Sequence, residues 1–247
     1  MKSVKDTILD RVSCRRYERE PLTPEQVDFI YQAIGNTPTS YNGQQFSVID
    51  VDDQKLKEQL YALTGQKQIK TCSHFFVFCL DYYKICEGAK AKGIEMPAFY
   101  NTLDGYTVGA VDAALAMMNA ITAAESLGLG TCPVGYARTV NPKAVSELLG
   151  LPDRVIVICG LAVGVPREHN DHKPKQPLSL LIHRNTYNPD VATDLLGYDL
   201  EVQRYNATRS GSTTDNDWIG HMIGYYREAM EYNLIEAFRL RGIYIYK

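Results

Sequence analysis

The sequence lacks a dominant charge, and this excludes some kinds of partner. Its 247 residues include 26 Lys and Arg and 29 Asp and Glu, which gives a formal net charge of −3. No basic stretch is interleaved with aromatic residues, so the composition argues against nucleic acid as a partner. The N-terminal residues 1–13 lack the apolar run of a signal peptide, and no segment reads as a transmembrane span. We therefore expect a cytoplasmic protein with no membrane partner.

Cysteine is sparse, and its spacing does not suggest a metal site or a disulfide framework. The six Cys, at positions 14, 72, 79, 86, 132 and 159, include no C-x-x-C pair. This usage is typical of reduced thiols in a cytoplasm. His169 and His172 could in principle bind a metal, but their loop offers no third ligand nearby, so we expect no metal.

Common catalytic and nucleotide-binding motifs are also missing. The sequence contains no Walker loop, no G-x-G-x-x-G, no G-x-S-x-G and no H-E-x-x-H. A ligand that carries phosphate would therefore have to be held by side chains from separate parts of the chain.

What the sequence does contain is a long apolar stretch near its middle, residues 107–136. Residues 110–129 are apolar on every side of a 3.6-residue spiral, which predicts a buried helix. Asp112 and Glu125 interrupt the stretch, so it is a poor membrane span. Gly128 and Gly130 are predicted to end the helix, because Gly tolerates the left-handed conformation of a helix stop.

The residues after this helix, 131–136, are predicted to be short and extended, with Pro and Gly among them. Backbone N–H groups in such a turn can face a flat ligand without a side chain in the way. The alternative is a core helix followed by a strand, with no ligand.

Helices and strands are predicted to alternate along the whole chain. Thr23, Pro24 and Gln26 form a capping box that starts a helix ending near Ile34. Further predicted helices cover 4–10, 54–63, 142–149, 196–209 and about twenty residues from Asp217, and predicted strands cover 46–51, 74–80, 155–163 and 242–246. This pattern predicts one α+β domain, 1–247, whose peripheral C-terminal part, about 196–247, packs on a second subunit.

Three polar clusters lie at the ends of apolar elements and are candidates for a binding site. The guanidinium group of Arg and the ammonium group of Lys both bind phosphate. Because like charges repel, cations gathered in one place need an anion between them. The alternative for each cluster is a solvated face without a ligand. The clusters are Arg11, Ser13, Arg15 and Arg16; Ser40, Asn42 and Gln44; and Lys173 with Lys175.

Seven short motifs connect the chain to a known family. They are R-V-S-C-R-R-Y at 11–17, E-P-L-T-P-E-Q at 20–26, T-S-Y-N-G-Q-Q at 39–45, L-T-G-Q-K-Q at 63–68, A-A-E-S-L-G-L-G at 123–130, C-G-L-A-V-G-V-P at 159–166 and H-K-P-K-Q-P at 172–177. Each motif is weak alone, but in this order and spacing the chain resembles the FMN-dependent nitroreductases, in the branch of oxygen-insensitive nitroreductases and NAD(P)H–flavin oxidoreductases. The resemblance covers nearly the whole chain.

The resemblance implies a three-layer α+β sandwich, with a mixed, mostly antiparallel sheet and helices on both faces. It also implies a homodimer formed through the long central helix, with two FMN molecules at the interface. Arg11, Ser13 and Arg15 would contact the FMN phosphate and ribityl chain, and Lys173 and Lys175 would complete the phosphate clamp. Arg11 and Lys175 depart from the family's frequent His and Arg, which preserves positive charge but leaves the phosphate geometry open.

The other implied contacts surround the flavin ring. Ser40, Asn42 and Gln44 would approach it from the partner subunit, with Gln66 as a further polar contact. The turn Pro133, Val134, Gly135 and Tyr136 would lie along the isoalloxazine and offer backbone N–H groups to it.

The implied activity is a ping-pong reaction that passes a hydride from NADH or NADPH through flavin to a nitroaromatic, quinone or free-flavin acceptor. The cofactor supplies the chemistry, so no catalytic acid or base is predicted. A different hypothesis is a non-catalytic flavin carrier, or a thiol-based redox sensor that uses Cys14 or Cys132. Cys14 lies among arginines that would lower a thiol pKa, but no resolving partner lies close in the sequence.

The segment 209–217 matches the family's loop for the NADPH 2′-phosphate, and Arg209 is the predicted coenzyme contact. A second Arg, common five residues later, is replaced here by Thr214, and Asp215 and Asp217 follow. Nearby carboxylates disfavour a phosphate and suit the ribose 2′-hydroxyl of NADH. We therefore expect NADH to be used at least comparably with NADPH; the alternative is a mobile linker with no role in specificity.

Overall fold

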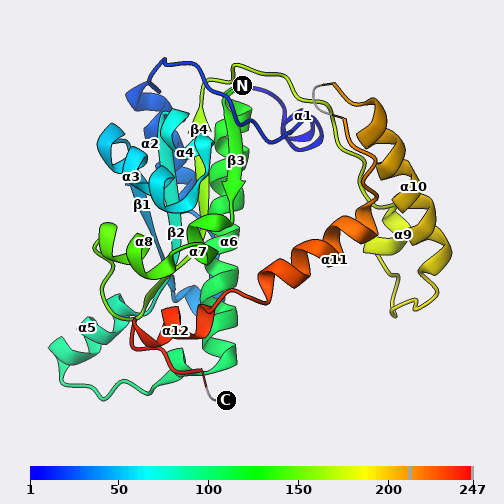
Figure 1. The fold of residues 1–247 in the computed structure, drawn as a ribbon. Helices are drawn as coiled ribbons and strands as arrows, with labels where there is room; N and C mark the ends of the chain where they lie inside the picture. The colour runs from blue at the N-terminus through cyan, green and yellow to red at the C-terminus, as the bar shows by residue number, and fades with distance from the viewer. Residues whose placement is uncertain (211–212, 246–247) are drawn as a thin grey trace. The chain divides into compact units, whose positions relative to one another are not determined.

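A four-stranded sheet is the centre of the larger of two units in the chain. The computed structural model describes residues 1–210 and 213–245. The first unit comprises Met1–His169 and Asn233–Lys247, and the second Asn170–Tyr232. The strand order is β1 (Phe46–Val51), β2 (His74–Asp81), β4 (Val155–Gly164) and β3 (Gly130–Val134), and all three neighbouring pairs are antiparallel (Figure 1). The predicted α+β fold is confirmed.

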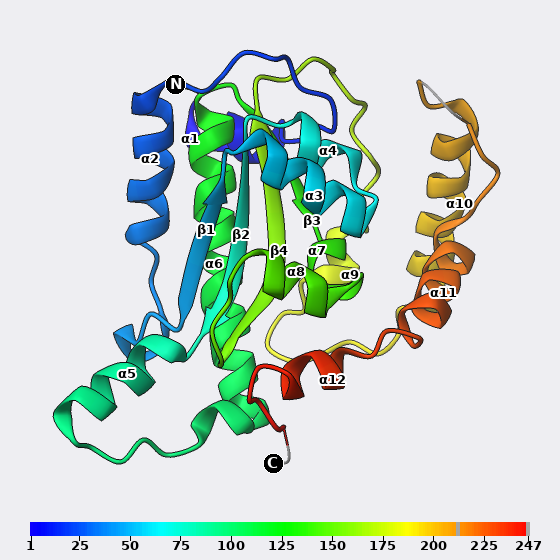
Figure 2. The same ribbon diagram turned by 60° about the vertical axis from the view of Figure 1, so that its left-hand side comes forward.

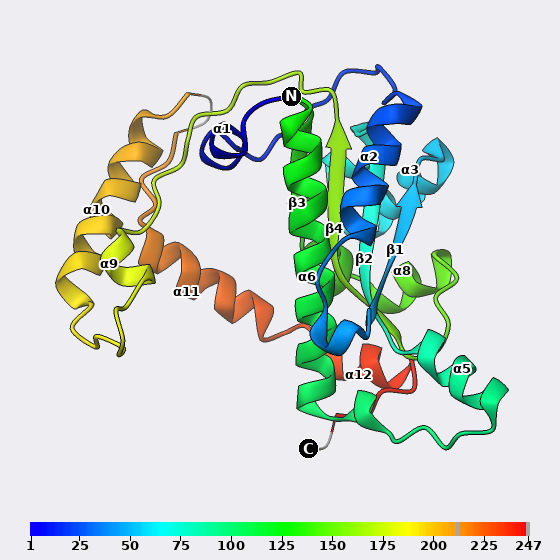
Figure 3. The same cartoon turned by 180° about the vertical axis from the view of Figure 1, so that it is seen from behind.

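Helices cover both faces of this sheet, because alternate residues of its strands are apolar on each side. On β2, Phe76 and Phe78 belong to one hydrophobic cluster, while Phe75 and Val77 belong to another. Helices α2 (Pro24–Gly35) and α6 (Leu103–Ser126) cover the first face (Figure 3). Helices α3 (Gln54–Thr64), α4 (Lys67–Thr71) and α8 (Pro142–Leu148) cover the second face (Figure 2).

The predicted capping box at the start of α2 is confirmed. Thr23 Oγ1 accepts a hydrogen bond from the Gln26 backbone N–H at 3.3 Å, and Gln26 Oε1 accepts from the Thr23 N–H at 2.9 Å. The strands predicted over 46–51, 74–80 and 155–163 and the helices over 4–10 and 54–63 are present, α1 as Val4–Leu9. The helix predicted from 196 begins earlier, as α10 (Ala192–Thr208).

Helix α6 differs from its prediction in its ends and in its burial. It runs from Leu103 to Ser126, and Gly128, at φ +79°, ends it. Gly130 does not help to end the helix; it already pairs in β3. Within this one chain the helix is not buried on every side, because Val111, Leu115 and Met118 are 49%, 42% and 43% exposed. By length and composition α6 could cross a membrane, but its packing against α2 and β2 makes it the core helix of this unit.

The ends of other elements also differ from their predictions. Asn141 precedes α8, but its side chain donates to the Leu63 carbonyl at 2.8 Å instead of capping the helix. The long helix predicted from Asp217 is two helices, α11 (Trp218–Ala229) and α12 (Leu234–Arg239). Residues 242–245 form no strand, and Tyr246 lies outside the described residues.

Several short elements were not predicted. They are α4, α5 (Tyr83–Lys92), α7 (Tyr136–Thr139), α9 (Leu178–Leu181) and the 3-10 turns η1 (Ser40–Asn42) and η2 (Phe99–Asn101). Helix α12 belongs to the first unit: Phe238 packs edge-on against Tyr106 of α6 with ring centroids 5.4 Å apart. The second unit contains α9, α10 and α11, and Tyr198 packs against Trp218 within it.

Candidate functional site

The segment Arg11–Tyr17 lies along the outer edge of strand β3. Ser13 forms a parallel bridge with Thr131, and the Cys14 N–H donates to the Thr131 carbonyl at 2.8 Å. The buried Tyr17 hydroxyl donates to the Cys14 carbonyl at 2.6 Å and fixes the segment from its other side. The local structure thus places Ser13 and its neighbours Arg11 and Arg15 beside the strand that leads into residues 133–136.

Arg11 has an unused hydrogen-bond donor in the interior. Its Nη1 atom is buried and has no hydrogen-bond partner. Burial raises the pKa of the neighbouring Glu125, while a hydrogen bond from Thr131 Oγ1 at 2.6 Å and the charge of Arg11 oppose that rise. Buried donors are nearly always satisfied, so an unpaired guanidinium nitrogen is suited to an anionic oxygen of a ligand.

Arg15 and Gln66 line a common pocket of about 470 Å³. Three further cations line it, Arg16, Lys67 and Arg167. The acidic residue bound to this rim is Glu168, whose Oε1 accepts from the Arg15 N–H at 2.6 Å. Its Oε2 lies 3.6 Å from the Arg16 Nε, but that side chain is 79% exposed, so the pair is weak. The pocket is therefore electropositive, as a phosphate site requires.

Lys67 and Arg167 are pocket residues that sequence reasoning did not select. Lys67 lies inside the motif 63–68, and Arg167 directly follows the motif 159–166. Their positions within or next to these motifs could have identified both residues as candidates from the sequence. Gln66 itself begins α4, and its Oε1 accepts from Gln68 Nε2 at 2.9 Å.

The segment 133–136 begins in β3, where Pro133 and Val134 pair with Leu161 and Gly160 of β4. Pro133 and Gly135 are exposed, Val134 is buried, and Tyr136 is half-buried. A Cβ atom added at Gly135 would meet nothing within 4 Å, so a flat ligand could approach this residue. The turn is not extended throughout as predicted, because Gly135 (φ −67°, ψ −32°) already has helical geometry and Tyr136 begins α7.

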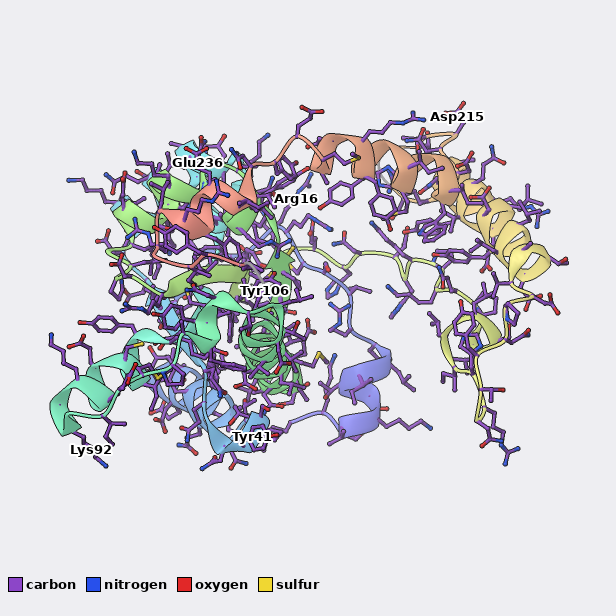
Figure 4. All side chains as sticks on the ribbon, turned by 90° about the horizontal axis from the view of Figure 1, so that it is seen from below. Arg16, Tyr41, Lys92, Tyr106, Asp215 and Glu236 are labelled. Atoms are coloured by element: carbon purple, nitrogen blue, oxygen red, sulfur yellow. The ribbon has the colours of Figure 1, made fainter. Side chains whose placement is uncertain are left out.

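Ser40, Asn42 and Gln44 lie elsewhere in the first unit, in the loop that enters β1. Phe46 pairs with Leu80 at the opposite end of the sheet from Gly130 and Gly164, where the 11–17 segment lies. The labels of Tyr41 of this loop and Arg16 are also well separated across the view of Figure 4, which looks along the strands. The Asn42 and Gln44 side chains are exposed. One copy of the chain therefore does not bring these residues to the basic pocket.

The second unit contains Lys173, Lys175 and Arg209. Both lysines are exposed. Ser210, next to Arg209, donates to Asp171 Oδ2 from its N–H at 2.9 Å and its hydroxyl at 2.6 Å, and these bonds lower the pKa of Asp171.

The described part of the 209–217 loop is tied to helix α10. The Thr214 N–H donates to the Asn206 carbonyl at 3.0 Å, and Asn206 Nδ2 donates to the Asn216 carbonyl at 2.8 Å. Asp217 Oδ1 caps α11 by accepting from the Gly220 N–H at 2.6 Å. This carboxylate is thus already engaged, and Asp215 is the one left exposed beside Thr214. Residues 211–212 lie outside the described residues.

The cysteines named for a redox role are not activated thiols. Burial raises the pKa of Cys14, and also that of Cys132 although the charges of Arg15 and Arg11 act against it. The expectation that arginines lower the Cys14 pKa is wrong, because the thiol is buried and its bond goes to the Arg16 carbonyl rather than to a cation. Within residues 1–210 and 213–245, no three His, Cys, Asp or Glu side chains gather as a metal site.

Comparisons with known proteins cover nearly the whole chain. Residues 8–165 match the nitroreductase family, and residues 173–244 match the C-terminal domain of that family. The chain is 34% identical to the FMN reductase [NAD(P)H] of Bacillus subtilis over the full length of both proteins. It is 36% identical to the oxygen-insensitive NADPH nitroreductase of Salmonella typhimurium over 85% of each.

Solved structures agree with this relationship. B. megaterium NfrA2 superposes with a TM-score of 0.93 at 33% identity over the whole of both chains. The NADPH:FMN oxidoreductase of Vibrio harveyi, solved with NAD+, superposes with a TM-score of 0.86 at 27% identity over 98% of each chain. The chain therefore belongs to the nitroreductase family.

Proposed function

We propose that the chain is an FMN-dependent oxidoreductase that passes a hydride from NADH or NADPH to a nitroaromatic, quinone or free-flavin acceptor. The observation that carries this proposal is the buried, unpaired Nη1 of Arg11, which lies beside the edge strand that Arg15 also adjoins. The residues present fit a phosphate-bearing group, since the pocket rim combines Arg15 with Arg16, Lys67 and Arg167. Relatives named as FMN reductase and NADPH nitroreductase support the same assignment.

The residues of the chain would bind and orient the cofactor. Arg11, Ser13 and Arg15 would hold the phosphate end of FMN. Gln66 and the segment 133–136 would face the ring. FMN, when bound, supplies both hydride acceptance and hydride donation, so no side chain is assigned as a general acid or base.

A homodimer supplies the remaining contacts. Val111, Leu115 and Met118 follow one another at helical spacing of four and three residues and form an exposed apolar stripe on α6. Exposed apolar stripes of this kind are typical of subunit interfaces. In the dimer, Ser40, Asn42 and Gln44 of the partner subunit approach the flavin, and α10 and α11 pack on the partner. We place this enzyme in the cytoplasm.

An anaerobic reduction experiment tests the proposed function. Purified protein loaded with FMN should lose its visible flavin absorbance when NADH or NADPH is added without oxygen, and an acceptor from each class should restore it. A yellow protein that neither coenzyme bleaches is a flavin carrier and not the proposed enzyme. A colourless protein that gains no absorbance with FMN contradicts the cofactor assignment.

A further inference from the structure

A buried carboxylate on α6 holds both ends of the loop that enters β1. Asp112 is 1% exposed. Its Oδ1 accepts from the Ser40 backbone N–H at 3.1 Å, and its Oδ2 accepts from the Gln45 backbone N–H at 3.1 Å. Each oxygen therefore holds one end of the segment that contains the predicted flavin contacts Ser40, Asn42 and Gln44.

The loop between these two bonds has an unfavourable backbone conformation. Tyr41, Asn42 and Gln44 have φ values of +53°, +55° and +51°. Residues other than Gly rarely adopt this left-handed backbone conformation, and the conformation persists only where surrounding contacts hold it. The Tyr41 side chain is 99% exposed, so side-chain packing does not hold this residue in place.

Most other contacts of the loop lie within it, including the backbone bonds from the Asn42 N–H to the Thr39 carbonyl at 3.1 Å and from the Gly43 N–H to the Ser40 carbonyl at 2.8 Å. The Gln44 N–H donates to Thr39 Oγ1 at 3.1 Å, and Gln44 Nε2 donates to the Asn42 carbonyl at 3.3 Å, both within the loop itself. Lys84 Nζ reaches the Gln44 carbonyl at 3.3 Å from an exposed position. From outside the loop, the buried Asp81 N–H also donates to the Gln45 carbonyl at 3.0 Å, whereas the Asp112 carboxylate bonds both ends of the loop.

We propose that Asp112 is a positioning residue for the flavin: by accepting both backbone N–H groups, it keeps residues 40–44 in the strained conformation that presents them to the ring. This role rests on the proposed function, in which the loop reaches the flavin of the partner subunit. Because Asp112 lies beside Val111 on α6, the same helix that would form the interface also fixes the loop that crosses it.

The test compares Asp112→Asn with Asp50→Asn. The new amide has one oxygen and one NH₂ group, so a donor must face one of the two loop N–H groups. Asp50 is a matched control, since it also joins separate elements, accepting from the Tyr31 hydroxyl at 2.5 Å and bonding His74 Nδ1 at 2.8 Å, but it does not touch the loop. Asp112→Asn should weaken FMN binding by about tenfold or more and change the visible spectrum of the bound flavin, whereas Asp50→Asn should do neither.

A second substitution separates positioning from general destabilisation. Gly adopts positive φ without strain, so Tyr41→Gly in the Asp112→Asn background should restore much of the FMN affinity. Amide hydrogen exchange of residues 40–45, measured without flavin, should be faster in Asp112→Asn than in the unmodified chain.

Three results overturn the proposal. They are an unchanged FMN affinity despite faster loop exchange, an equal loss of affinity in Asp50→Asn, and no recovery with Tyr41→Gly. An unmodified chain that binds no FMN overturns the proposed function instead, and the exchange experiment still reports whether Asp112 holds the loop.

Discussion

The two ends of the sheet in the first unit carry different halves of the candidate site, and they are built differently. At one end, the segment 11–17 is attached along strand β3 and presents cations with few acidic partners. At the other end, the loop 39–45 presents uncharged side chains and depends on one buried carboxylate of α6. The first arrangement suits a phosphate and the second an uncharged ring, and in the proposed dimer each site combines the two ends from different subunits.

Breaking the proposed dimer should have the largest effect, because in the proposed function each site needs the loop 39–45 of the partner subunit. Leu115→Glu places a carboxylate in the middle of the exposed stripe on α6. Burying this charge in an interface would cost desolvation free energy and so oppose association. Sedimentation should change from a species near twice 27.8 kDa to one near 27.8 kDa, and FMN should be lost. Ile85→Glu, an equally exposed apolar position on α5, is the control and should remain dimeric. A flavin-loaded monomer would contradict the shared site.

Weakening the basic end alone should have a smaller effect. Arg15→Ala removes one charged donor to the phosphate, and such a bond contributes roughly 1.5–3 kcal/mol. FMN affinity, measured by quenching of flavin fluorescence, should therefore fall about ten- to a hundredfold. Arg19→Ala, at an exposed arginine that lines a different pocket, should leave the affinity within about twofold. Equal losses in both variants would show that only overall charge matters.

Coenzyme choice should respond less strongly. We expect the unmodified chain to use NADH at least comparably with NADPH, because Thr214 and the exposed Asp215 offer a 2′-phosphate no second cation. Thr214→Arg should raise kcat/KM for NADPH several-fold and leave that for NADH nearly unchanged, while Thr213→Arg serves as the neighbouring control. A preference of about a hundredfold for NADPH in the unmodified chain would refute this expectation, as would a Thr214→Arg variant without any gain.

The smallest expected effect is on stability in the flavin-free protein. Burial raises the pKa of Glu125 above its ordinary value, so the folded chain binds this proton more tightly than the unfolded chain. Proton binding by Glu125 therefore contributes fully to the free energy of unfolding below the pKa of the unfolded chain, about 4.3. This contribution is lost as the pH rises through the raised pKa of Glu125 in the folded chain. Glu125→Gln should flatten the pH dependence of the denaturation midpoint over this range, whereas Asp171→Asn, at a fully exposed group, should not. An unchanged pH profile in Glu125→Gln would show that Glu125 does not titrate as described.

Patterns of neighbouring residues predicted much of this fold. The capping box at Thr23–Gln26 and the apolar strand at 155–163 were found because the signal and the structure lie in the same few residues. The side-chain bond of Asn141 was missed because a distant contact decides it: Asn141 donates to the Leu63 carbonyl instead of capping its helix. The break after Ala229 does have a local signal, Asn233, whose Oδ1 accepts from the Glu236 N–H at 3.2 Å at the start of α12.

The sequence predicted only part of the candidate site, because some of its contacts join residues that are far apart in the chain. Arg11, Ser13 and Arg15 could be selected from a local motif, and the parallel bridge at Thr131 supports them together. The unpaired Arg11 nitrogen and the two bonds of Asp112 depend on residues about 70 or more positions away, which no local pattern reveals. Thiol reactivity was misjudged because sequence neighbours show charge but not burial.

A mixed dimer tests most directly whether each site combines the two ends from different copies. One chain carries Arg15→Ala, and a differently tagged chain carries Asn42→Gly with Gln44→Gly, which removes both side chains while tolerating their positive φ. A dimer purified through both tags should contain one doubly impaired site and one unmodified site. It should therefore bind one FMN per dimer with the affinity of the unmodified protein, although each variant alone binds weakly. If each site lay within a single chain, both sites would carry a defect, and no FMN would bind with that affinity.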